Sequence, residues 1–147
     1  MTSSSSPPPI AIVLGIGGLI PLLGLALIVW FDPLGYRPAA TAALVGYGAS
    51  IFSFLGAIYW GLGMRDASPA GPSIWVWGVV PSLIAWVALL LAPTAGLGLI
   101  TAGLVACLIV DSQVYQRHQL AAWLPLRRVL TGVASVCCLA AAWGATQ

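Results

Sequence analysis

The chain has 147 residues, of which 61% are hydrophobic and only 5% are charged. Five arginines and three aspartates give it a formal net charge of +2. In soluble domains about a quarter of the residues are charged, so a soluble chain of this composition would expose apolar surface and aggregate. The small charge, with no basic stripe, also excludes a nucleic-acid-binding surface. We therefore expect an all-α membrane protein of one domain.

Residues 1–9 consist largely of Ser and Pro and contain no basic residue, which indicates a short disordered tail and not a signal peptide. Residues 10–147 then form a single five-helix transmembrane domain, because each apolar stretch is close to the roughly 20 residues that cross a bilayer. Pro21 lies in the middle of the first stretch and is expected to kink it. The expected spans are residues 10–31, 39–64, 74–92, 96–115 and 126–144.

The loops between the spans contain turn residues and nearly all of the charge. Residues 32–38 and 67–73 are rich in Pro and Gly, and residues 93–96 form a short turn that makes an antiparallel hairpin of the third and fourth helices. Residues 116–125 are read as a polar loop before the last helix.

The arginines predict the orientation. With five spans, Arg65, Arg117, Arg127 and Arg128 share one side of the membrane, and only Arg37 lies on the other. Cytoplasmic loops carry an excess of basic residues. We expect the amino terminus in the cytoplasm and the carboxyl terminus outside, in a bacterial inner membrane.

The second span carries a repeat of small residues, with Ala49, Ser53, Ala57 and Gly61 spaced four apart. Small residues at this spacing allow helix backbones to approach closely. The repeat is interpreted either as packing within the bundle or as a face that docks a partner or a second copy. Four hydroxyl side chains lie on the same span: Tyr47, Ser50, Ser53 and Tyr59. They either line a small polar cavity or bond backbone and neighbouring helices.

Asp111 follows a fully apolar run at the end of the fourth span, and Arg127 and Arg128 begin the fifth span on the same side. Ionisable residues within a span are candidate functional residues. Three interpretations remain open: a carboxylate exposed at the boundary, a structural ion pair across the hairpin, or a proton- or ligand-handling group.

The residues needed for common enzyme sites are missing from the sequence. It contains no glutamate, no lysine and one histidine, His118, so a zinc-binding H-E-x-x-H helix and a phosphate-binding loop with its lysine are excluded. Cys107, Cys137 and Cys138 lie within apolar stretches and are read as small buried hydrophobic residues. We expect no enzymatic activity, cofactor or metal site.

Three segments resemble one family. They are YGASIFSFLGAIYWG from Tyr47 to Gly61, VPSLIAW from Val80 to Trp86, and Asp111 followed by WLPLRRVLT from Trp123 to Thr131. In this order they resemble the transmembrane-protein-69-like family of bacterial inner membranes and mitochondria. The resemblance implies a small polytopic membrane protein without an assigned activity.

The resemblance also implies which positions belong to the family's recurring motifs: Ser53, Trp60, Pro81, Trp86, Asp111 and Arg127. Leu124 stands where a second aromatic residue is expected beside Trp123. The Trp-rich, five-helix profile is similar to the tryptophan-rich sensory/translocator proteins at the level of fold alone.

Two functions are consistent with these patterns. The first is a non-enzymatic accessory or assembly protein that packs with itself or with other membrane proteins, through the small-residue repeat. The alternative is a small-molecule or lipid-binding or transport protein, with Trp60, Trp86 and the hydroxyl side chains forming the pocket.

Overall fold

The computed structural model describes residues 6–32, 34–65 and 71–147, and all regular structure in these ranges is helical. Five of its segments are long and apolar enough to cross a membrane, which confirms the expected fold class. The first span consists of two helices, and a single 3-10 turn precedes the last span. The helices are α1 (Pro9–Gly17), α2 (Leu19–Phe31), α3 (Arg37–Arg65), α4 (Pro72–Leu90), α5 (Pro93–Arg117), η1 (Ala121–Trp123) and α6 (Leu124–Gly144).

The helix ends differ from the expected ones mainly at prolines. Pro9, Pro72 and Pro93 each begin a helix, although the sequence placed them in a tail or a loop. Proline is favoured in the first helical turn, where its missing N–H has no partner to lose and its fixed φ suits the helix. The expected turn at residues 93–96 is therefore the first turn of α5. Of the expected disordered tail, residues 1–5 lie outside the described residues.

The first span is broken at Gly18, between α1 and α2. Pro21 has no N–H to bond the carbonyl one turn earlier, so the helix is weakened here, as the sequence predicts. The Tyr47 hydroxyl of α3 donates a hydrogen bond to the Gly18 carbonyl, with an O···O distance of 2.9 Å. A neighbouring helix thus bonds the irregular backbone, which would otherwise be costly in hydrocarbon.

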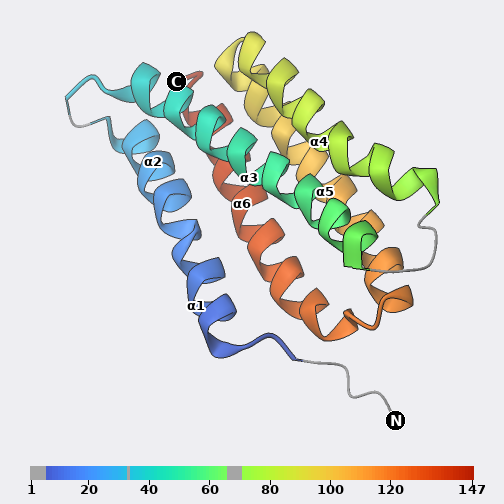
Figure 1. Cartoon of the computed structure of the whole chain (residues 1–147). Coiled ribbons are helices and arrows are strands. Elements are labelled where there is room, and N and C mark those ends of the chain that lie inside the picture. Colours follow the sequence, from blue (N-terminus) through green and yellow to red (C-terminus); the bar gives the residue numbers. More distant parts are fainter. Residues whose placement is uncertain (1–5, 33, 66–70) are drawn as a thin grey trace.

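Helices α3, α5 and α6 form the centre of the bundle (Figure 1). Helix α2 packs against α3 and α6 on one side, and α4 packs against α3 and α5 on the other. Helix α1 contacts α2 and α6 and has no buried residue. The three cysteines are free and buried, as expected from their apolar surroundings.

Helices α3 and α4 cross at two glycines. A Cβ added to Gly56 would lie 2.7 Å from the Gly78 carbonyl oxygen, and one added to Gly78 would lie 2.2 Å from the Trp60 ring. No side chain fits at either position without a shift of backbone or ring. This crossing fixes the position of α4 along the carboxyl half of α3. The same half of α3 carries one residue of the site described next.

Candidate functional site

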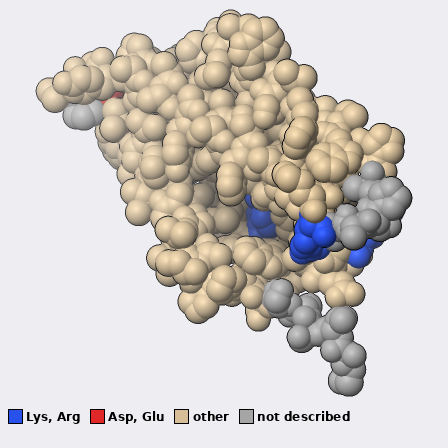
Figure 2. Space-filling view, in the orientation of Figure 1, with Lys and Arg blue, Asp and Glu red and all other residues tan. Residues whose placement is uncertain are grey.

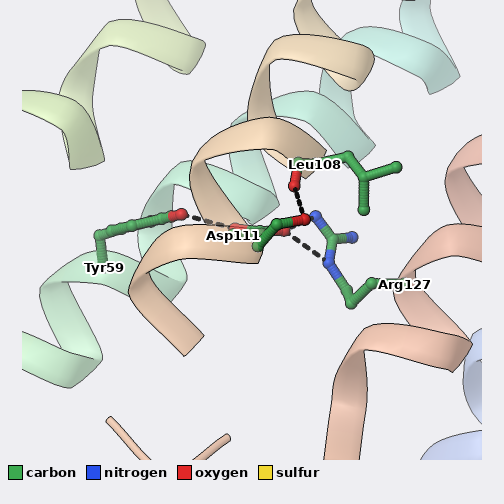
Figure 3. Close-up of polar contacts among 5 residues, drawn as sticks. Tyr59, Leu108, Asp111 and Arg127 are labelled. Atoms are coloured by element: carbon green, nitrogen blue, oxygen red, sulfur yellow. Dashed lines mark hydrogen bonds and ion pairs between the residues drawn. The ribbon is translucent and has the colours of Figure 1, made fainter. Parts of the chain in front are cut away.

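The most buried charged residue of the described chain is Asp111, on α5, which is 1% exposed. Its Oδ1 accepts a hydrogen bond from the Tyr59 hydroxyl at 2.5 Å. Its Oδ2 accepts one from Arg127 Nε at 2.8 Å and another from Arg127 Nη2. Figure 3 shows the carboxylate between the two partners, which come from α3 and α6. Both carboxylate oxygens are therefore occupied.

The hairpin of α5 and α6 brings Asp111 and Arg127 together. Arg127 is the fourth residue of α6, and the connection from α5 contains only residues 118–123. Two antiparallel helices joined by so short a segment place the end of one beside the start of the other. The guanidinium then points inward and not to solvent, and Arg127 is only 8% exposed.

Tyr59 connects this pair to the rest of the bundle. Its ring is 1% exposed and packs edge-to-face against Trp77 of α4, with ring centroids 6.5 Å apart and an interplanar angle of 78°. The Asp111 carboxylate thus lies at the meeting point of α3, α5 and α6, with α4 behind the tyrosine. The network links four helices at one end of the molecule.

Apolar and weakly polar side chains enclose the network. Cys107 and Tyr115 lie one turn before and after Asp111 on the same face of α5, and they are 0% and 4% exposed. Thr131, one turn after Arg127, is also buried. A carboxylate removed from water needs charged and hydrogen-bonding partners, and this one has both. Of the three interpretations of Asp111, the geometry corresponds to the ion pair across the hairpin.

The other candidate residues lie apart from this network. Arg128 is exposed on the outside of α6, so only one of the two neighbouring arginines faces Asp111. Pro81 is buried against Gly56, and Ser53 is half-buried on α3. Trp86, in the middle of α4, is 59% exposed.

Trp60 closes the α3–α4 crossing. Its indole N–H donates to the Trp75 carbonyl at 3.2 Å, and the two rings pack edge-to-face with centroids 5.3 Å apart. Because Trp60 covers Gly78 while Trp86 faces outward, the two tryptophans do not line a common pocket.

The small-residue repeat of α3 is divided between two faces. Ala49 is buried at 4% exposure, whereas Ala57 and Gly61 are exposed, and a Cβ added to Gly61 would meet no atom within 4 Å. Ala49 therefore packs within the bundle, and the later part of the repeat faces outward.

In the sequence analysis, Tyr59 is identified only as one of four hydroxyl side chains on its span, and its hydrogen bond to Asp111 is not predicted. A signal for the pairing is present in the sequence, since Tyr59 and Asp111 each lie six residues before the arginine that ends their helix, Arg65 or Arg117. The helices α3 and α5 run in the same direction, so equal spacing from these ends gives equal depth.

Apart from Arg37, which pairs with Asp32 at the opposite end, the arginines gather at the end of the molecule that contains this network. Figure 2 shows them near the end of α3 and α5, while the acidic atoms visible on this face lie at the opposite end. Within the described residues, no three His, Cys, Asp or Glu side chains form a group that would hold a metal ion.

In the part of the chain that the structure describes, five apolar spans and a buried ion pair define a polytopic α-helical membrane protein. The family model described as "Protein of unknown function (DUF3429)" matches residues 7–143, and the chain belongs to this family. It is 38% identical over 133 residues to transmembrane protein 69 of Xenopus tropicalis, which confirms the resemblance to that family. The match covers 86% of this chain and 51% of the relative, so the chain spans about half the length of that protein. No solved structure matches the chain.

Proposed function

We propose that this protein is a non-enzymatic accessory or assembly component that binds another transmembrane helix through the outer face of α3. The observation that carries the proposal is the composition of that face. Its central positions are small, and they define what we call the outer α3 face: Ala43, Gly46, Ser50, Ala57 and Gly61. Four of the five are exposed and Gly46 is half-buried.

Two large side chains border the outer α3 face. At 100° per residue, Phe54 and Trp60 project on either side of the line through Ala57 and Gly61. They are 66% and 42% exposed. Small residues between two large ones allow a second helix to approach closely, and such packing drives helix association in lipid.

The outward face of α4 is a useful contrast, because it consists of large side chains. Val76, Leu83, Trp86 and Leu90 are all more than half exposed there. Large apolar side chains are suited to fluid lipid, which needs no shape complementarity, whereas the outer α3 face offers a second helix a close backbone approach. This difference favours α3 as the docking helix.

We also propose a membrane and an orientation for this protein. The family contains membrane proteins, and we place this member in a bacterial inner membrane with its amino terminus in the cytoplasm. The excess of arginine at the end formed by Arg65, Arg117, Arg127 and Arg128 supports this orientation. Alkaline phosphatase fused after Gln147 is expected to be active, and the same enzyme fused in the loop after Arg65 is expected to be inactive.

The docking proposal is tested by Gly61→Ile, which places a branched side chain on the outer α3 face. Gly132→Ile on α6 is the matched control, because Gly132 is also exposed and a Cβ there would meet no atom within 4 Å. Complexes are purified in mild detergent and sized by native mass spectrometry. We expect Gly61→Ile to lose the partner or second copy that the native chain and the control retain. Equal complexes for all three chains would rule out the outer α3 face as the docking site.

The alternative, a small-molecule transporter with a pocket formed by Trp60 and Trp86, has less support. The α3–α4 crossing at Gly56 and Gly78 is tight, and Trp86 faces away from it. The indole N–H of Trp60 is already bonded to backbone.

A further inference from the structure

A surface depression of about 390 Å³ lies at the carboxyl end of α5, lined by Gln113, Gln116 and Arg117. The three residues are exposed and lie on adjacent turns of one helix face, since their spacing is three and four residues. Two side-chain amides and a guanidinium offer several N–H donors, and only the amide oxygens accept. A concave surface with this lining is suited to an anion.

The charges nearby favour an anion as well. Asp111 is the last acidic residue of the sequence, and both of its oxygens are held by Tyr59 and Arg127. After Asp111 the sequence contains Arg117, Arg127 and Arg128 and no aspartate or glutamate, whereas Asp66, which follows Arg65, lies outside the described residues. The carboxyl end of a helix has a negative dipole, so an anion here depends on the Arg117 side chain for its attraction.

The length of α5 favours a position of the depression among the lipid headgroups. Helix α5 has 25 residues, which at 1.5 Å per residue span about 37 Å. The hydrocarbon core of a bilayer is about 30 Å thick. The helix is thus longer than the hydrocarbon core by about 7 Å, and its polar residues are at the carboxyl end, which favours this end as the one that reaches the lipid phosphates.

We infer that Gln113, Gln116 and Arg117 form a binding site for the phosphate of an anionic phospholipid. Arg117 supplies the charge, and its planar fork of N–H donors matches two phosphate oxygens. The two glutamines donate to the remaining oxygens or to the polar part of the headgroup. The site is independent of the outer α3 face, which lies on another helix.

The inference is tested with short-chain lipids added to the purified full chain in a non-ionic detergent. Binding of dihexanoyl-phosphatidylglycerol is compared with binding of dihexanoyl-phosphatidylcholine by isothermal titration calorimetry. We expect the native chain to prefer the anionic lipid. Because hydrogen bonds to charged groups are among the stronger ones, Arg117→Gln should weaken phosphatidylglycerol binding about tenfold. Phosphatidylcholine has the same phosphate with a choline cation beside it, so its weaker binding should fall by a smaller factor.

Arg128→Gln is the matched control, because Arg128 is exposed at the same end but does not line the depression. We expect this variant to bind phosphatidylglycerol within about twofold of the native chain, whereas Gln116→Leu should show an intermediate loss. Equal losses for the two arginine variants would mean a diffuse charge effect and would overturn the site, as would equal binding of the two lipids by the native chain. Thermal unfolding followed by tryptophan fluorescence confirms that each variant is folded.

Inorganic phosphate distinguishes a lipid from a free anion. We expect millimolar phosphate not to displace the lipid, because the acyl chains add binding energy in the micelle. Displacement by inorganic phosphate would overturn the assignment to a lipid and would indicate a site for free phosphate.

Discussion

Two Asp–Arg pairs lie within residues 6–32, 34–65 and 71–147, one at each end of the bundle, and they differ in almost every structural respect. Asp32 and Arg37 are five residues apart in the turn before α3, with 3.7 Å between Asp32 Oδ2 and Arg37 Nε, and about a quarter of each side chain is exposed. Asp111 and Arg127 come from different helices, and their side chains are 2% and 10% exposed. The same two residue types thus shape a local turn at one end and hold the bundle together at the other.

The backbone explains the role of the exposed pair. Asp32 adopts a left-handed conformation with φ of 36°, and its Oδ1 accepts a hydrogen bond from the Arg37 backbone N–H at 3.0 Å. The carboxylate therefore satisfies a free donor at the start of α3. This function needs an oxygen acceptor but does not need the arginine side chain.

The largest expected effect is that of Asp111→Asn. The substitution keeps the volume but leaves the Arg127 guanidinium buried without a counter-charge, and breaking a buried pair in this way costs about 3–5 kcal/mol. The free energy of unfolding is measured in mild detergent by titration with SDS. An unchanged value would show that the buried pair does not stabilise the bundle.

A double variant tests whether Asp111 and Arg127 stabilise the bundle as a pair or as two independent side chains. Adding Arg127→Gln to Asp111→Asn removes the uncompensated charge, so the double variant should be more stable than Asp111→Asn alone. Strictly additive losses would mean that the two side chains act independently, against the contacts in Figure 3.

An intermediate effect is expected for Tyr59→Phe. It removes one hydrogen bond to a charged acceptor, and such bonds contribute about 1.5–3 kcal/mol. Tyr47→Phe is the matched control, because the Tyr47 hydroxyl bonds a neutral carbonyl. A loss of about 1 kcal/mol is expected there. If the control lost more stability than Tyr59→Phe, the carboxylate would not be the stronger acceptor in this bundle.

The smallest effect is expected for Asp32→Asn. The asparagine oxygen can still accept from the Arg37 N–H, and exposed ion pairs contribute only about 0–1 kcal/mol. The same SDS titration should give a free energy of unfolding close to that of the native chain. A loss as large as that of Asp111→Asn would remove the distinction between the two ends.

The fold was largely predictable because each span is a long apolar stretch between charged or turn-rich segments. The helix ends were less predictable, since Pro72 and Pro93 are compatible with either a loop or a first helical turn. The sequence indicated the pairing of Asp111 with Arg127 because one short connection brings them together. From the sequence alone Arg128 is an equally good partner for Asp111, because which of the two arginines faces the carboxylate depends on how α6 is rotated about its axis.

Other features depend on packing between helices that are distant in the sequence. Tyr59 reaches Asp111 only because α3 and α5 lie side by side, and no local pattern specifies that neighbour. Similarly, Ala49 and Gly61 belong to one repeat, yet one is buried and the other exposed. A repeat of four drifts around a helix of 3.6 residues per turn, so over twelve residues it passes from one face to another.

The residues of the buried network come from three different helices, and this has a consequence for the order in which the network forms during synthesis. Chains emerge amino terminus first, so Tyr59 and Asp111 are made before Arg127. Until α6 is in place, the carboxylate has its tyrosine but not its cation, and the fourth span carries an acid that lipid disfavours. Insertion of α6 supplies the missing charge, which makes its arrival the step that stabilises the helices before it.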